Sequence, residues 1–103
     1  MNLKNADLHY NLGLAFHQKG NLEAATTEYK KVIQIDPQHF DAHYCLGNIY
    51  TEQGDLKAAK VFYRKAIQIN PKDAGLHYNL GLVFHNLGDF EMAKDSYKQA
   101  IQI

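Results

Sequence analysis

The sequence predicts an all-α fold of three antiparallel helix–turn–helix hairpins, and three observations lead to it. The segment LHYNLGLAFHQKG at 8–20 returns as LHYNLGLVFHNLG at 76–88, and AHYCLGNIYTEQG at 42–54 stands midway, so the chain repeats every 34 residues. Each repeat holds two stretches with apolar residues at helical spacing. Glycine and proline recur between the stretches, where helices end. We expect helices over residues 6–19, 22–35, 40–53, 56–69, 74–87 and 90–103.

Both stretches of unit one carry an apolar face. In the first, the apolar residues fall at i, i+4, i+7 and i+8, and they are Leu8, Leu12, Ala15 and Phe16. In the second, the residues with the same kind of spacing are Leu22, Ala25, Tyr29, Val32 and Ile33. The residues between these positions are mostly polar, so each stretch predicts one amphipathic helix.

Short polar sequences mark the helix ends. Within each unit, a glycine suited to the left-handed conformation precedes a residue able to cap the next helix, in the pairs Gly20-Asn21, Gly54-Asp55 and Gly88-Asp89. Between units, proline stops the second helix, at Asp36-Pro37 and Asn70-Pro71. Asn5 and Asp73 are the expected caps of the first helices of units one and three.

A glycine lies inside the first helix of every unit, where it costs about 1 kcal/mol relative to alanine. These residues are Gly13, Gly47 and Gly81. An alanine follows each of them 12 residues later, at a matching height on the second helix: Ala25, Ala59 and Ala93. We therefore expect close helix–helix approach, with the small pair at the contact.

Length and charge set limits on function. The 103 residues suit a single domain, 1–103, with repeats 6–39, 40–73 and 74–103. Eleven basic residues balance eleven acidic ones, which argues against a nucleic-acid or anionic-membrane partner. Cys45 is the single cysteine and has no disulfide partner in this chain. With no apolar leader or spanning segment, we expect a soluble, cytoplasmic protein.

The repeated residues resemble the tetratricopeptide repeat, whose signature runs W-x2-L-G-x2-Y, then A-x3-F, then P. In unit one the matching residues are Leu12, Gly13, Phe16, Ala25, Tyr29 and Pro37. Units two and three match in the same way, except that unit three stops before its proline, and the resemblance covers residues 6–103. The signature tryptophan is replaced in all three units, by His9, His43 and His77.

The resemblance implies a right-handed superhelical α-solenoid whose first helices line a concave groove, and a scaffold that binds protein without catalysis. The spacing of the first helices agrees, because each has a second face about 100° from its apolar face. We expect the partner-binding groove to be lined by Asp7, Tyr10, Asn11, Leu14, His17, Asp41, Tyr44, Asn48, Thr51, Tyr78, Asn79, Leu82 and His85.

The role of the groove residues has alternatives. Tyr10, Tyr44 and Tyr78 either contact a partner, for which tyrosine is well suited, or pack between neighbouring first helices. The side-chain amides of Asn11 and Asn79 could bind a peptide backbone as rungs of an asparagine ladder. Against this, the equivalent position in unit two is Cys45, which interrupts the ladder. Co-chaperone members of the family grip an acidic C-terminus with lysine, asparagine and arginine. The matching positions here carry no cation: Tyr10, Leu14, Cys45, Gly75 and Asn79.

Other functions have little support in the sequence. The histidines at one per unit lie too far apart to share a metal ion, because neighbouring helices are about 8–10 Å apart, so we expect no metal site and no cofactor. Neither Cys45 nor Ser96 has an evident base, and we expect no enzyme activity. Because no polar capping helix follows residues 90–103, the alternatives to a module that binds a protein or peptide ligand are weak end-to-end self-assembly and a fragment of a longer repeat array.

Overall fold

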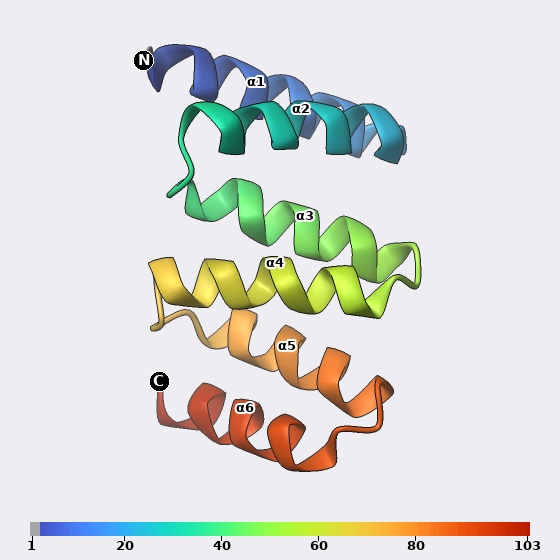
Figure 1. Cartoon of the computed structure of the whole chain (residues 1–103), viewed down its shortest axis with the longest axis vertical. Helices are drawn as coiled ribbons and strands as arrows, with labels where there is room; N and C mark the ends of the chain where they lie inside the picture. The colour runs from blue at the N-terminus through green and yellow to red at the C-terminus, as the bar shows by residue number, and fades with distance from the viewer. Residues whose placement is uncertain (1–2) are drawn as a thin grey trace.

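The computed structural model describes residues 3–103, which form six α-helices and contain no strand. The helices stack in chain order along the long axis of the molecule, each antiparallel to the one before (Figure 1). Their bounds are α1 (Leu3–Gln18), α2 (Leu22–Ile35), α3 (Phe40–Glu52), α4 (Leu56–Ile69), α5 (Ala74–Asn86) and α6 (Phe90–Gln102). The predicted all-α solenoid of three hairpins is confirmed.

Only the start of α1 departs clearly from the predicted bounds. The helix begins at Leu3, so Asn5 lies inside it and is not the cap that we expected. In units two and three, Pro37 and Pro71 lie shortly before the first helix and limit its extension. No proline precedes α1, and Leu3 and Lys4 are both good helix formers.

The remaining helix starts are capped by side chains. Asp73 Oδ1 accepts a hydrogen bond of 2.9 Å from the Leu76 amide, as predicted. The cap of α3 was not predicted: it is His39, whose Nδ1 accepts from the Ala42 amide at 3.1 Å. A neutral imidazole nitrogen can therefore do at unit two what a carboxylate does at unit three.

In the turn inside each hairpin, one residue forms hydrogen bonds to both helices. The Asn21 amide donates to the Phe16 carbonyl at 2.9 Å, which closes α1, and Asn21 Oδ1 accepts from the Ala24 amide at 3.2 Å, which caps α2. Asp55 and Asp89 repeat both bonds in the other units. The glycine before each of them has a φ of 80° to 83°, which an L side chain rarely adopts.

The histidines at the signature tryptophan position hold the connections between units. His43 Nε2 lies 2.9 Å from the Pro37 carbonyl oxygen, and His77 Nε2 lies 2.7 Å from that of Pro71. In unit one, the Nδ1 atom of His9 is instead 2.8 Å from a carboxylate oxygen of Glu28. In units two and three an imidazole N–H can therefore donate to a proline carbonyl that has no helical partner.

Each mid-helix glycine accommodates a tyrosine ring. A β-carbon on Gly13 would lie 2.6 Å from Cε1 of Tyr29, and one on Gly81 would lie 2.5 Å from Cε1 of Tyr97. The mid-helix glycines therefore lie against a side chain of the second helix. The nearest side chain, however, is the tyrosine 16 residues later and not the alanine 12 residues later that we expected.

The apolar face predicted for α1 is only partly buried. Leu8 and Leu12 are 58% and 46% exposed, whereas their equivalents in α5, Leu76 and Leu80, are 0% and 5% exposed. The α5 leucines share a buried cluster with Ala59 and other residues of α4. Within residues 3–103 no helix covers the corresponding face of α1, so its predicted apolar face is exposed at Leu8 and Leu12.

Candidate partner-binding groove

The first helices of the three units are linked directly by side chains spaced 35 residues apart. The hydroxyl of Tyr10 on α1 lies 4.0 Å from the sulfur of Cys45 on α3. One unit later, Asn79 Nδ2 on α5 donates to the hydroxyl oxygen of Tyr44 on α3 at 3.3 Å. These contacts place α1, α3 and α5 next to one another, so that one face of each helix contributes to a shared surface.

A hollow of about 260 Å³ lies in this surface and spans all three first helices. It is lined by His17, Asn48, Thr51, Glu52, Tyr63, Asn79 and Leu82. Five of these seven residues were predicted to line the groove. The hollow and the predicted residues therefore share one face, because residues at i, i+3, i+7 and i+10 of each first helix point the same way.

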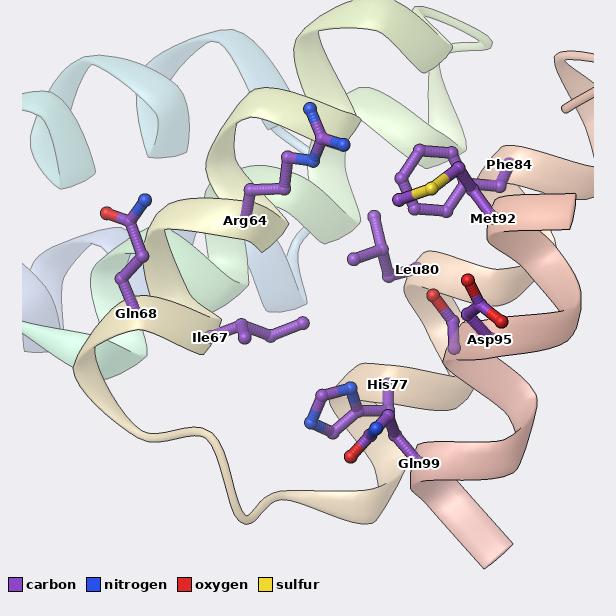
Figure 2. A pocket seen from close by; sticks show the side chains of 10 residues that line it. Arg64, Ile67, Gln68, His77, Leu80, Phe84, Met92, Asp95 and Gln99 are labelled. Atoms are coloured by element: carbon purple, nitrogen blue, oxygen red, sulfur yellow. The ribbon is translucent and has the colours of Figure 1, made fainter.

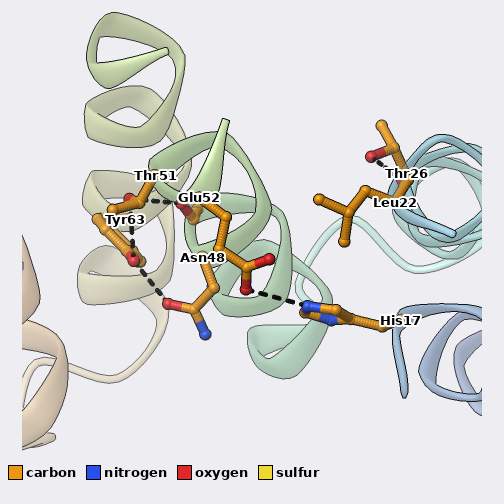
Figure 3. Close-up of polar contacts among 8 residues, drawn as sticks. His17, Leu22, Thr26, Asn48, Thr51, Glu52 and Tyr63 are labelled. Carbon is orange, nitrogen blue, oxygen red and sulfur yellow. Dashed lines mark hydrogen bonds and ion pairs between the residues drawn. The ribbon is translucent and has the colours of Figure 1, made fainter. Parts of the chain in front are cut away.

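A polar network shapes the floor of the hollow (Figure 3). The Tyr63 hydroxyl donates to Asn48 Oδ1 at 2.5 Å and accepts from Thr51 Oγ1 at 3.3 Å. At the edge toward α1, His17 Nε2 lies 3.2 Å from a carboxylate oxygen of Glu52. Asn48 and Thr51 are therefore held in place by hydrogen bonds to Tyr63.

Two residues of the hollow, Glu52 and Tyr63, were missed from the sequence. Glu52 stands next to Thr51 on α3 and reaches the groove only because it turns toward His17, 35 residues earlier. The other contacts between first helices also join residues 35 positions apart. This spacing could have indicated Glu52 as a neighbour of His17. Tyr63 comes from a second helix, and its hydroxyl reaches the groove past Gly47, which has no side chain to block it.

The three groove tyrosines are not equivalent. Tyr78 is 52% exposed, while Tyr10 and Tyr44 are half-buried between helices. The ring centroid of Tyr10 lies 5.8 Å from that of Tyr29, and the Tyr44 centroid lies 6.0 Å from that of Tyr63. Tyr10 and Tyr44 therefore follow the packing alternative in large part, and Tyr78 offers the freest aromatic surface.

The other predicted residues divide by exposure. Six of them are exposed: Asp7, Asn11, Asp41, Thr51, Leu82 and His85. Those nearer the contacts between first helices are half-buried: Leu14, His17, Asn48 and Asn79. Asp7 and Asn11 do not line the hollow, and neither do Asp41 and His85.

The charge of the groove is weakly acidic. Asp7, Asp41 and Glu52 contribute carboxylates, and the predicted groove residues with the lining of the hollow include no lysine or arginine. Burial raises the pKa of the Tyr44 hydroxyl, which stays protonated at neutral pH. The surface can thus offer hydroxyl, amide and apolar contacts, but no cation to pair with a partner's carboxylate.

Neither a metal centre nor a reactive thiol is formed in the part of the chain that the structure describes. No group of three or more His, Cys, Asp or Glu residues within residues 3–103 could hold a metal ion. Burial raises the pKa of the Cys45 thiol, which disfavours the nucleophilic thiolate. No helix over the same residues is long and apolar enough to cross a lipid bilayer.

Comparison with known proteins agrees with the repeat pattern. A family model described as TPR repeat matches residues 14–54 and 47–88, and one described as Tetratricopeptide repeat matches residues 74–103. No curated protein matches the sequence. Crystal structures of MamA superpose with TM-scores of 0.92 and 0.90 at 27% identity over 98% of this chain.

The matched structures differ in how much of their own length this chain covers. This chain covers 59% and 55% of the two MamA chains, so it spans little more than half of their length. The first TPR of Spaghetti (RPAP3), solved bound to the HSP90 peptide SRMEEVD, superposes with a TM-score of 0.92 at 18% identity. In that case the alignment covers 99% of this chain and 81% of the other.

Proposed function

Because the chain belongs to the tetratricopeptide repeat family, we propose that it is a non-catalytic module that binds a segment of a partner polypeptide in the groove of α1, α3 and α5. Repeats of this family are generally protein–protein interaction modules. The observation that carries the proposal is the hollow of about 260 Å³ across all three units. Pockets for small molecules usually measure about 300–1,000 Å³, so the hollow suits one side chain of a longer ligand.

The chemistry of the groove favours a segment that is not acidic. Asp41 and Glu52 would repel a partner's carboxylates, and no lysine or arginine lines the hollow. Tyr78 and Leu82 offer apolar area at one end, being 52% and 39% exposed. Asn48 and Asn79 offer amides for a peptide backbone. An extended or helical segment of neutral or mildly basic character therefore fits best.

The test begins with affinity capture on the protein, identification of the bound segment, and calorimetric titration of that segment. The double variant Y78A/L82A should lower affinity at least about tenfold, or 1.4 kcal/mol, since it removes the exposed apolar contacts of the groove. V61A is the matched control, because Val61 is 61% exposed but lies on α4, outside the groove. Unchanged affinity in a folded Y78A/L82A protein would place the partner elsewhere.

A second titration tests the charge argument. The acidic peptide SRMEEVD, bound by the RPAP3 repeat domain, should show no saturable binding here. The positions that would form a two-carboxylate clamp carry Tyr10, Leu14, Cys45, Gly75 and Asn79. Saturable binding of this peptide would overturn the conclusion that the groove rejects acidic segments.

End-to-end assembly is the second candidate, and it rests on different residues. Ile101 on α6 is 83% exposed, although its equivalent Ile67 packs against the buried cluster shared by α4 and α5. At the other end, Leu8 and Leu12 occupy the positions at which Leu76 and Leu80 contact α4. The face of α6 therefore resembles the surface that α5 packs on, and a second copy could seat its α1 there.

The mass of the protein across concentrations separates the two candidates. Self-association predicts a weight-average mass that rises with concentration in sedimentation equilibrium. I101E should abolish the rise, because a charge would replace the apolar contact. A polar helix appended after Ile103 should do the same and raise the melting temperature. A chain that stays monomeric up to millimolar concentration would exclude assembly and leave the groove proposal intact.

A further inference from the structure

A second cavity lies away from the groove, among α4, α5 and α6 (Figure 2). Its volume is about 410 Å³. The walls are largely apolar, and charged or polar side chains surround them. The lining residues are Arg64, Ile67, Gln68, His77, Leu80, Phe84, Met92, Asp95, Ser96 and Gln99. None of these belongs to the proposed groove, so any ligand of this cavity would occupy a separate site.

Unit two shows one way in which the equivalent space is filled. The residue of unit two that corresponds to Ser96 is Phe62, 34 positions earlier. The ring of Phe62 stacks on Tyr50 with centroids 5.5 Å apart and planes 11° apart. The same ring lies 6.1 Å from the imidazole of His43. A phenyl group thus fills the equivalent space in unit two.

Unit three keeps the partners of that ring but lacks the ring. Phe84 stands where unit two has Tyr50, and His77 stands where it has His43; both line the cavity. Ser96 is only 7% exposed, so it lies at the bottom of the space and not on its rim. In unit one the equivalent residue is Glu28, whose carboxylate is held by His9 at 2.8 Å. Of the three residues, Ser96 has the shortest side chain.

The rest of the frame is also repeated. Lys30 Nζ lies 5.8 Å from the Tyr50 ring centroid, and the guanidinium carbon of Arg64 lies 5.2 Å from that of Phe84. Met92 replaces Ala58 and is 36% exposed at the cavity. Its unbranched thioether can shift and re-pack around an incoming ring. The cavity is therefore open to an aromatic guest and has an adaptable wall.

We propose that the cavity among α4, α5 and α6 binds an aromatic side chain, that of a phenylalanine on a partner polypeptide. The ring enters beside Ser96 and contacts Phe84, His77 and Leu80, in the place that Phe62 takes in unit two. Ring contacts of this kind contribute beyond the area they bury. This site goes beyond the groove proposal, and it gives the protein a second contact on the side formed by its second helices.

The experiment is a titration of isotopically labelled protein with acetyl-Gly-Phe-Gly-amide, followed by amide chemical shifts. Saturable shifts are expected at residues 64–68 of α4, at His77, Leu80 and Phe84 of α5, and at residues 92–99 of α6, and none with acetyl-Gly-Ala-Gly-amide. S96F should weaken the binding at least about tenfold, because its own phenyl ring fills the space as Phe62 does. S96A should bind as the unmodified protein does, since it removes only a hydroxyl.

Three outcomes would overturn the proposal. Binding to S96F that equals binding to S96A would show that the cavity is not the site. Shifts centred on Tyr78 and Leu82 would assign the peptide to the groove, and Y78A/L82A would then abolish them. The absence of saturable shifts at these three segments would show that the cavity takes no aromatic ring. If S96F does not fold, S96L blocks the same space with a smaller side chain and replaces it.

Discussion

The side-chain amide of Asn79 donates a hydrogen bond of 3.3 Å to the hydroxyl oxygen of Tyr44, which lies 35 residues earlier on the preceding first helix. The bond joins unit three to unit two on the groove side. In a stacked repeat protein each unit is stabilised by its own contacts and by those with its nearest neighbours. Tyr44 therefore supports the array as well as lining its surface.

The first prediction concerns this bond. Y44F should lower the free energy of unfolding by about 1 kcal/mol, because the amide of Asn79 loses its acceptor. Y78F is the matched control, since the Tyr78 hydroxyl has no hydrogen-bond partner among residues 3–103. Urea unfolding followed by circular dichroism measures both. Equal stability of Y44F and Y78F would show that the bond does not contribute in solution.

The second prediction concerns the glycine–tyrosine contact of unit three. G81A gains about 1 kcal/mol of helix propensity, but its methyl group would lie 2.5 Å from the Tyr97 ring. Overpacking of this kind costs about 1–3 kcal/mol, so a net loss of stability is expected. Thermal unfolding should show that Y97L in the same chain recovers part of the loss. A G81A protein as stable as the original would mean that the ring moves aside freely.

The third prediction concerns the pH dependence of stability. Burial holds the pKa of His43 below its ordinary value of 6.5, and Lys65 and His39 act in the same direction. The Nε2 atom donates to Pro37, and the buried Nδ1 has no partner within the described residues, so protonation there is unfavourable. The unfolded chain binds the proton more readily. The contribution of neutral His43 to the free energy of unfolding is therefore complete above pH 6.5, and it is lost as the pH falls below that value.

The measurement is the urea midpoint at about pH 7.5, 6.5 and 5.5, a range that brackets the ordinary titration of histidine. H43F removes the titrating group at this position, and its midpoint should fall less over this range than that of the unmodified protein. H85Q removes a histidine at an exposed position and serves as the control for the loss of an imidazole. A slope that is the same in H43F and the unmodified protein would show that His43 is already free to titrate when folded.

The fourth prediction concerns the thiol of Cys45. Burial raises its pKa, and the hydroxyl of Tyr10 lies 4.0 Å from its sulfur. Alkylation by iodoacetamide at pH 7.5 should therefore be at least about tenfold slower in the folded protein than in urea, since the thiolate is the reactive form. Mass spectrometry of timed samples measures this. Equal rates would indicate a reactive thiol and reopen the question of nucleophilic chemistry.

Local signals explain what could be predicted from the sequence. The turn at Gly20-Asn21 needs only a left-handed glycine and one capping side chain, and both are properties of adjacent residues. The same holds for the cap at Asp73. The prediction that Asn5 caps α1 was wrong because a capping residue acts only where a helix starts, and α1 starts earlier, at Leu3.

The direction of side chains and the presence of neighbouring helices explain what could not be predicted from the sequence. The spacing of Gly13 and Ala25 fixes their height along the hairpin, but the ring of Tyr29 reaches back over a turn to meet the glycine. Leu8 has the same sequence context as Leu76, yet its exposure depends on whether another helix lies over it. For the proposed groove, periodicity predicted which residues share one face, whereas the difference between Tyr44 and Tyr78 depends on the neighbouring unit.

The likeness of the first and third units has a consequence for refolding. Residues 8–17 of α1 and 76–85 of α5 differ only at Ala15 and Val83. In the first hairpin the ring of Tyr29 on α2 packs against Gly13 of α1, and α5 has the equivalent glycine, Gly81. The α5 helix of one molecule can therefore pack on α2 of another in the place of α1. Such exchange is a characteristic error of repetitive chains. Refolding at high protein concentration should thus pass through entangled dimers that resolve slowly, and dilution should remove that slow phase.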